Sequence, residues 1–177
     1  LIDALVLAGV WARLDALYVF AAADSATALT NLKSSSYGAT LVNAPAFAVD
    51  RGFTGAATKY IDTGFNPTTA AGNYSQDSAH VSARSRTTGQ SVGAIAGTSG
   101  AVAARVLTLF PRYLDDKVYA RANTTNEFSG DSPDGLGLFS LRRASSASNV
   151  FPDPVGASMK TRSLVCNASI TDSTASH

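Results

Sequence analysis

The sequence has few of the residues on which most enzyme chemistry depends. Among 177 residues there are one cysteine, one tryptophan, one glutamate and two histidines. A single cysteine excludes an intrachain disulfide and a zinc site built on paired cysteines. One histidine is the last residue, and no Gly-x-Ser-x-Gly segment accompanies the other, so nothing marks a Ser-His-Asp triad. The sequence therefore predicts no catalytic residues, no metal site and no cofactor.

Charge is also scarce. Charged residues make up 15% of the chain and the formal net charge is +1, against roughly 25% charged residues in an average soluble domain. Nucleic-acid binding needs a dense basic stripe, and the short pair Arg142–Arg143 is interpreted as a solvated strand end. Three charged residues interrupt the apolar opening stretch, Leu1–Ala23, so it holds no uncharged span of about 18 residues. We therefore expect neither nucleic-acid binding nor membrane insertion.

The first 35 residues carry a helical pattern. Apolar residues recur at helical spacing over Ile2–Tyr18, which predicts an amphipathic helix for the opening stretch. Asp24 can cap a second helix over Ala26–Leu32. Trp11 falls on the first helix, and we expect it to pack against a neighbouring domain or subunit as an assembly contact. Residues 1–35 are interpreted as a helical lead-in.

After Tyr37, short apolar runs alternate with turn-forming residues. Many short strands with no helical pattern between them predict that residues 36–177 form a mainly β domain, a jelly-roll β-sandwich. The expected strands are Ala39–Val42, Ala46–Asp50, Lys59–Thr63, Ala79–Arg86, Val92–Ala96, Ala103–Phe110, Lys117–Ala122, Leu136–Arg142 and Ser163–Asn167. In two of them, at 79–86 and 117–122, small apolar residues alternate with polar ones, which predicts one buried and one wet face.

Side chains on those wet faces are the candidate carbohydrate contacts: His80 and Arg84 on one strand, Tyr119 and Arg121 on the other. His80 is interpreted as an exposed sheet residue rather than a base. The aromatic residues that could offer a platform for a sugar are Tyr60, Tyr74, Tyr113 and Tyr119.

The acidic residues show no catalytic or calcium-binding pattern. Glu127 is interpreted as a solvated loop residue, because no neighbouring aspartate completes the carboxylate pair of a glycoside hydrolase. Asp115 and Asp116, like Asp131 and Asp134, fit turn chemistry better than a calcium loop.

Four segments together resemble a known family: Ala8–Phe20, Asp24–Leu32, Asp50–Gly55 and Lys59–Pro67. They look like the concanavalin A-like (laminin-G-like) modules of bacteriophage structural proteins, over about residues 1–90. The resemblance implies a jelly-roll sandwich on the virion surface, in a tail, fibre or head spike. Its partners would be other virion proteins, copies of itself and host-surface polysaccharide. The family continues with further strands and a closing helix, so the sandwich would be incomplete at its C-terminus.

These observations favour a non-enzymatic virion surface module that contacts host glycans weakly and gains strength from many copies. Two alternatives stay open. One is a purely architectural virion protein without a ligand. The other is a polysaccharide depolymerase on the same fold, in which Asp115, Asp116, Asp131 and Asp134 would supply the acid chemistry.

Overall fold

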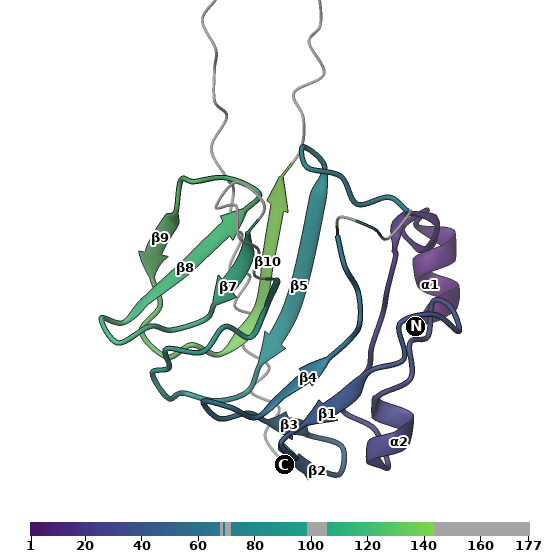
Figure 1. Cartoon of the computed structure of the whole chain (residues 1–177), viewed down its shortest axis with the longest axis horizontal. Helices are drawn as coiled ribbons and strands as arrows, with labels where there is room; N and C mark the ends of the chain where they lie inside the picture. The colour runs from purple at the N-terminus through teal and green to yellow at the C-terminus, as the bar shows by residue number, and fades with distance from the viewer. Residues whose placement is uncertain (68, 70–71, 99–105, 144–177) are drawn as a thin grey trace, which may run out of the picture. The chain divides into compact units, whose positions relative to one another are not determined.

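The computed structural model describes residues 1–67, 69, 72–98 and 106–143 (Figure 1). The chain divides into two compact units, Leu1–Tyr74 and Ser75–His177. Residues 36–74, which the sequence pattern groups with the sandwich, thus lie in the first unit. The strand expected at 163–167 lies outside the described residues.

The expectation of a mainly β chain after a short helical segment is confirmed. The helical elements are α1 (Ile2–Leu7), the 3-10 turn η1 (Trp11–Arg13) and α2 (Ser25–Ala28). The strands of the first unit are β1 (Thr40–Val42), β2 (Ala46–Ala48), β3 (Gly52–Thr54) and β4 (Tyr60–Asp62). Those of the second unit are β5 (Ala79–Ser85), β6 (Ala96–Thr98), β7 (Leu107–Phe110), β8 (Lys117–Ala122), β9 (Phe128–Asp131) and β10 (Gly137–Arg143). Every pairing between these strands is antiparallel.

The long first helix expected from the apolar spacing is wrong, because the helix ends at Leu7. Gly9 adopts a φ of 67° and donates its N–H to the Val6 carbonyl, while the Val10 N–H reaches back to the Leu5 carbonyl. This pair of bonds is a Schellman cap, which satisfies the last carbonyls of a helix and turns the chain away. The second helix is also shorter than expected, although Asp24 does cap it by accepting the Thr27 N–H at 2.8 Å.

The first unit is held by two small sheets and by aromatic contacts. Strand β1 pairs with β4, and β2 pairs with β3 in a hairpin. Phe53 on β3 contacts both Phe20 and Phe47, with ring centroids 5.9 and 4.9 Å apart. A second cluster joins Phe65 to Tyr37 and Tyr74. Offset and edge-on aromatic pairs add about 0.5–1.5 kcal/mol each beyond the area that they bury.

The second unit contains two sheets. Strands β6 to β9 follow one another in an up-and-down sheet of order β6-β7-β8-β9, and β5 pairs with β10 along seven residues. Buried side chains come from one face of each sheet: Ala79, Leu107, Leu109, Val118, Ala120, Ala122, Phe139 and Leu141. The alternation predicted for the strands at 79–86 and 117–122 is confirmed by this pattern.

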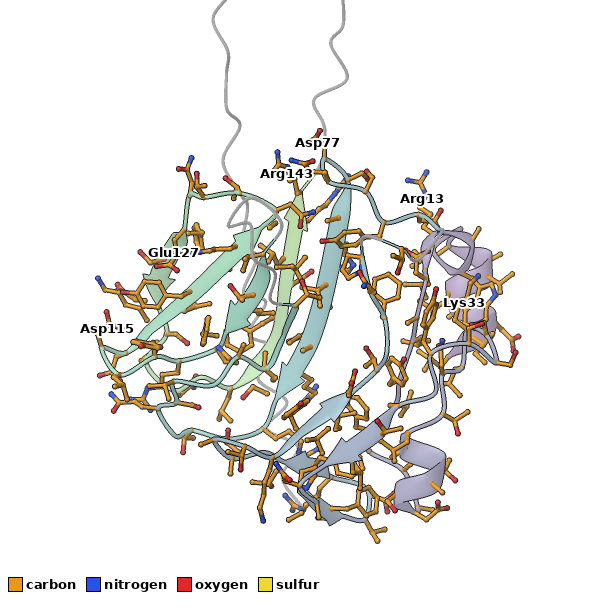
Figure 2. All side chains as sticks on the ribbon, viewed as in Figure 1. Arg13, Lys33, Asp77, Asp115, Glu127 and Arg143 are labelled. Carbon is orange, nitrogen blue, oxygen red and sulfur yellow. The ribbon has the colours of Figure 1, made fainter. Side chains whose placement is uncertain are left out.

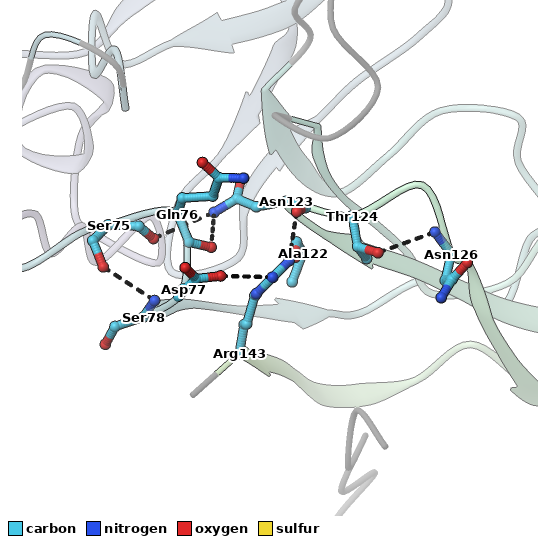
Figure 3. A network of polar contacts seen from close by, with 9 residues as sticks. All are labelled: Ser75, Gln76, Asp77, Ser78, Ala122, Asn123, Thr124, Asn126 and Arg143. Carbon is cyan, nitrogen blue, oxygen red and sulfur yellow. Dashed lines mark hydrogen bonds and ion pairs between the residues drawn. The ribbon is translucent and has the colours of Figure 1, made fainter. Parts of the chain in front are cut away.

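An arginine on the inner face of β10 connects the two sheets of this unit (Figure 3). Arg143, at the end of β10, donates to the backbone carbonyls of Ala122 and Asn123 at the end of β8. Its guanidinium also forms an ion pair with Asp77 at 2.6 Å. Because the inner face of β10 thus meets β8, the faces that carry polar residues on the two sheets point outward, away from each other.

Two strands were not expected and one is displaced. Strands β3 and β9 occupy Gly52–Thr54 and Phe128–Asp131, where glycine and polar residues predict turns. Both become strands because each pairs with the strand that precedes it, and such pairing outweighs weak intrinsic preference. Strand β6 starts at Ala96, the last residue of the run predicted at 92–96, where Gly97 allows the close approach of the Leu107 carbonyl.

Candidate functional site

The outer face of the four-stranded sheet carries the best-formed group of aromatic and polar side chains. The register of β7 and β8 places Phe110 beside Tyr119 and Thr108 beside Arg121. Val118 and Ala120 point inward and are buried, whereas Tyr119 and Arg121 are partly exposed. Two of the predicted carbohydrate contacts are therefore neighbours on one outer face.

Three rings line this face in a continuous chain. Phe110 meets Tyr113 edge-on at 5.9 Å, and Tyr113 meets Tyr119 edge-on at 5.5 Å. All three rings are half-buried, so each offers apolar carbon to the solvent side. We refer to these rings with their polar neighbours Asp115, Arg121 and Glu127 as the aromatic face.

Polar groups accompany these rings, and Figure 2 labels two of them, Asp115 and Glu127. The Tyr119 hydroxyl donates to the Asp115 carboxylate at 2.7 Å, and Arg121 Nε donates to Glu127 Oε2 at 3.0 Å. The hydrogen bond to Asp115, followed by desolvation and the negative charge of Asp115, raises the pKa of the Tyr119 hydroxyl. The side chains of Arg121 and Glu127 are each 36% exposed, so both can reach a ligand as well as each other.

The hairpin between β7 and β8 holds Tyr113 and Asp115 in place. Asp116 closes the turn with a φ of 62°, and its carboxylate accepts from Gln90 at 2.6 Å and from Arg112 at 2.9 Å. These two hydrogen bonds lower the pKa of the Asp116 carboxyl. A hairpin tied to the preceding loop in this way presents its side chains in a fixed geometry, which a binding site requires.

The other two predicted contacts lie on the second sheet. His80 and Arg84 point outward from β5, beside the outward residues of β10, so the structure does not bring them together with Tyr119 and Arg121. The His80 Nε2 atom lies 2.9 Å from both the Ser82 and the Ser140 hydroxyl oxygens, and those two oxygens are 2.9 Å apart. Burial, and then the charge of Arg142, lower the pKa of the His80 ring. His80 is exposed, as the sequence predicts, although its ring is partly covered by neighbouring side chains.

Part of the aromatic face can be predicted from the sequence. Tyr119 and Arg121 follow from the alternation along one strand, and Tyr113 is among the tyrosines noted above. Phe110, Asp115 and Glu127 were not expected there, because only the cross-strand register and the turn place them beside Tyr119. Glu127 is an exposed loop residue, as the sequence predicts, and it also pairs with Arg121.

Trp11, the predicted assembly contact, lies in the first unit and is half-buried there. The Lys33 ammonium sits 4.9 Å from the centre of the indole ring and donates to the Trp11 carbonyl at 2.8 Å. One face of the indole is therefore covered by its own chain, and a role in assembly stays a prediction.

The first unit also has an open depression of about 510 Å³ beside α2. Asn31 lies in its wall, is 6% exposed, and is fully engaged: its amide oxygen accepts from the Leu17 and Lys33 N–H groups and its amide nitrogen donates to the Ser36 carbonyl. These bonds hold the loop of residues 31–36 together. The Asn31 side chain is therefore not available to a ligand in this depression.

Three of the four aspartates considered for calcium accept local hydrogen bonds: Asp115, Asp116 and Asp134. Asp134 accepts the Leu136 N–H at 3.0 Å, as expected for a turn residue. Within the described part of the chain, no three His, Cys, Asp or Glu residues gather closely enough to hold a metal ion. No helix among the same residues is long and apolar enough to cross a membrane.

Comparison with known protein families, with curated proteins and with solved structures finds no match for this chain. The family that the segments resemble stays a prediction.

Proposed function

We propose that this chain is a non-enzymatic carbohydrate-binding module of a virion surface, and that the aromatic face is its glycan site. The observation that carries the proposal is the row of Phe110, Tyr113 and Tyr119 with carboxylate and guanidinium groups at its side. The finer fold expected above, a concanavalin A-like jelly roll, belongs to the same proposal, supported by the two antiparallel sheets of the second unit.

The chemistry of a sugar fits this arrangement. A pyranose ring presents an apolar C–H face and a rim of hydroxyl groups. The half-buried tyrosine rings supply large, rigid contact area with little rotamer entropy to lose on binding. Asp115 and Glu127 can accept hydrogen bonds from sugar hydroxyls, and Arg121 can donate to them.

A sheet face binds less tightly than an enclosed pocket, because it removes less of the ligand from water. A module of this kind therefore needs several linked copies, and linking converts the second binding event into an intramolecular one. Repeated display on a virion, the setting implied by the resemblance, would provide those copies. Such display would also bring contacts with other virion proteins.

The contacts of the Asp115 and Glu127 carboxylates favour binding over hydrolysis. Hydrolysis of a glycosidic bond requires one proton-donating carboxyl group and one free carboxylate on either side of that bond. Here Asp115 accepts from Tyr119, and Glu127 is held by the positive charge of Arg121. Each carboxylate is thus already engaged by a neighbouring side chain of the aromatic face.

The test is a glycan array probed with the full chain coupled to a multivalent carrier. The site variants are Tyr113→Ala and Arg121→Gln, and Tyr60→Ala is the matched control, since Tyr60 is 55% exposed in the first unit. We expect the carrier to bind a defined set of glycans, both site variants to lose at least tenfold in signal, and the control to keep it. Thermal unfolding of each variant checks that the fold is intact.

Two other results would overturn the proposal. Absence of binding by the multivalent protein to any glycan leaves the architectural alternative. Release of reducing ends from a bound polysaccharide, lost in Asp115→Asn, would establish the depolymerase alternative instead.

A further inference from the structure

The outer face of the β5–β10 pair has a composition quite different from that of the aromatic face. Its residues stand opposite one another in three cross-strand pairs: His80 with Arg142, Ser82 with Ser140, and Arg84 with Leu138. Directly opposed side chains have Cβ atoms about 4.5–5.5 Å apart, so these six form one continuous strip. His80, Ser82, Arg84, Leu138 and Arg142 are exposed.

At the centre of the strip three polar atoms meet. His80 Nε2 and the hydroxyl oxygens of Ser82 and Ser140 form a triangle whose three sides are each 2.9 Å. The Ser82 hydroxyl donates to the Ser140 oxygen, and a hydroxyl proton can rotate to another acceptor, so Ser82 can donate to a ligand instead. A hydroxyl donor and an imidazole nitrogen therefore lie side by side in front of the sheet.

The charge around this point is positive. Arg142 stands opposite His80 and is close enough for its charge to lower the pKa of the imidazole. Among the residues that the structure describes, neither Arg142 nor Arg84 has a carboxylate within ion-pair distance, in contrast to Arg112, Arg121 and Arg143. An arginine without an acidic partner beside converging hydroxyls is suited to bind an oxygen anion.

We infer that this strip binds an oxyanion, a carboxylate or a sulfate ester, through the Ser82 hydroxyl, the His80 ring and the Arg142 guanidinium. The guanidinium provides two parallel N–H donors that match the two oxygens of the anion, and the hydroxyl and imidazole groups complete the set. The inference does not rest on the proposed function, because the aromatic face belongs to the other sheet.

Catalysis by the serine and histidine is less well supported by the same geometry. An activated serine needs its histidine oriented by a third group, and a donor pair for the developing oxyanion. No carboxylate contacts the His80 ring in the described part of the chain, and the charge that acts on the ring is that of the cationic Arg142. The positive surroundings oppose protonation of the imidazole, which a general base must accept.

The experiment follows the His80 ring by NMR in the full chain, with His177→Gln leaving a single imidazole signal. Sodium sulfate, sodium galacturonate and neutral galactose are titrated in turn at pH 6, with sodium chloride keeping the ionic strength constant. We expect a saturable shift with sulfate and galacturonate and none with galactose. Arg142→Gln should weaken binding about tenfold, and Ser82→Ala severalfold, the usual effects of losing a charged and a neutral hydrogen bond.

Arg86→Gln is the matched control, because it removes the same charge from an exposed position just beyond the end of β5, four residues from Ser82. We expect it to weaken binding less than twofold. Equal losses in Arg86→Gln and Arg142→Gln, or a shift that grows linearly without saturating, would mean a diffuse positive surface and would overturn the inference.

Two further titrations distinguish the source of the anion. Polygalacturonate that binds at least tenfold more tightly than galacturonate, per galacturonate unit, identifies an acidic polysaccharide as the ligand. Equal affinity per unit identifies a small free anion. Either result supports an oxyanion site, and both are independent of what the glycan array shows for the aromatic face.

Discussion

Tyr119 and Asp115 are joined by a hydrogen bond of 2.7 Å between the phenol and the carboxylate, at the point where the β7–β8 hairpin meets the outer face of its sheet. The bond orders both the turn and the ring. It also favours the neutral phenol over the phenolate, since the phenolate would face a negative carboxylate without a proton between them.

The first prediction concerns this bond. Tyr119 should titrate above the ordinary tyrosine pKa of 10.0, because Asp115 accepts its proton in a hydrogen bond and repels the phenolate. Asp115→Asn should bring the pKa of Tyr119 down toward 10. Ultraviolet difference titration of the two proteins measures the change.

Tyr18 supplies an internal control in that titration. Burial raises its pKa as well, and it lies in the first unit, so Asp115→Asn should leave its late titration unchanged. A difference spectrum without a shifted tyrosine would show that Tyr119 and Asp115 do not interact in solution.

The second prediction concerns the His80 ring. Burial and the charge of Arg142 lower its pKa below 6.5, so the unfolded chain binds a proton more readily than the folded protein. The stability that His80 contributes is thus complete above pH 6.5, and is lost as the pH falls through the lower pKa of the folded state. Urea unfolding between pH 7 and pH 4.5 measures this loss.

Arg142→Gln tests the electrostatic part of that shift. Removing the positive charge should raise the pKa of His80, but not fully to 6.5, because burial is the larger cause. An NMR titration of the imidazole in both proteins gives the two values. An unchanged pKa would place the guanidinium farther from the ring than the structure does.

The third prediction concerns Asn123, which is 4% exposed and has a φ of 52°. Its amide nitrogen donates to the Ser75 carbonyl at 3.4 Å and the Gln76 carbonyl at 3.1 Å (Figure 3). Asn123→Ala should lower the free energy of unfolding by about 3 kcal/mol, through lost hydrogen bonds and a strained backbone. Asn123→Gly keeps the backbone relaxed and should cost about 1 kcal/mol less. Equal losses would mean that strain plays no part.

The fourth prediction concerns Asp15 and Gly72 in the first unit. The Asp15 carboxylate accepts the backbone N–H groups of Asn73 at 2.7 Å and Tyr74 at 2.9 Å. A Cβ atom on Gly72 would lie 2.2 Å from Asp15 Oδ1, so Gly72→Ala should push the carboxylate off its partners and cost about 1–3 kcal/mol.

A double-mutant cycle separates this clash from other effects of the alanine. In an Asp15→Ala background, Gly72→Ala should cost little, because the atom that it would strike is gone. The fluorescence of Trp11, the one tryptophan in the chain and part of the same unit, reports the unfolding. Additive losses in the cycle would contradict a direct contact between the two residues.

The sequence allowed the alternating strands to be predicted well. Lys117–Ala122 was predicted with the bounds that the structure has, because a period of two in a short run bounded by turn residues has few other solutions. The helix over the opening stretch failed, since apolar spacing continues through Gly9 although the backbone there turns left-handed. Periodicity measures which residues could share a face, and it does not measure whether the backbone between them stays helical.

The candidate site was predictable only in part, for a related reason. Tyr119 and Arg121 follow from one strand, but Phe110 lies beside Tyr119 through the register of two strands. Asp115 reaches the same ring through a turn that places it four residues before its partner. His80 and Arg84 looked equivalent to Tyr119 and Arg121 in the sequence, because both pairs lie on the wet side of an alternating strand.

The amino-acid sequence alone indicates that the chain is mainly β, that it carries little charge, and that two of its strands have one buried and one polar face. Local composition and a period of two are enough for these properties, since each depends on residues close together in the chain. The tertiary structure decided which polar faces belong together. It placed Phe110, Tyr113 and Tyr119 in one row, and His80 with Ser140 on the other sheet, because strand pairing brings together residues that no local pattern connects.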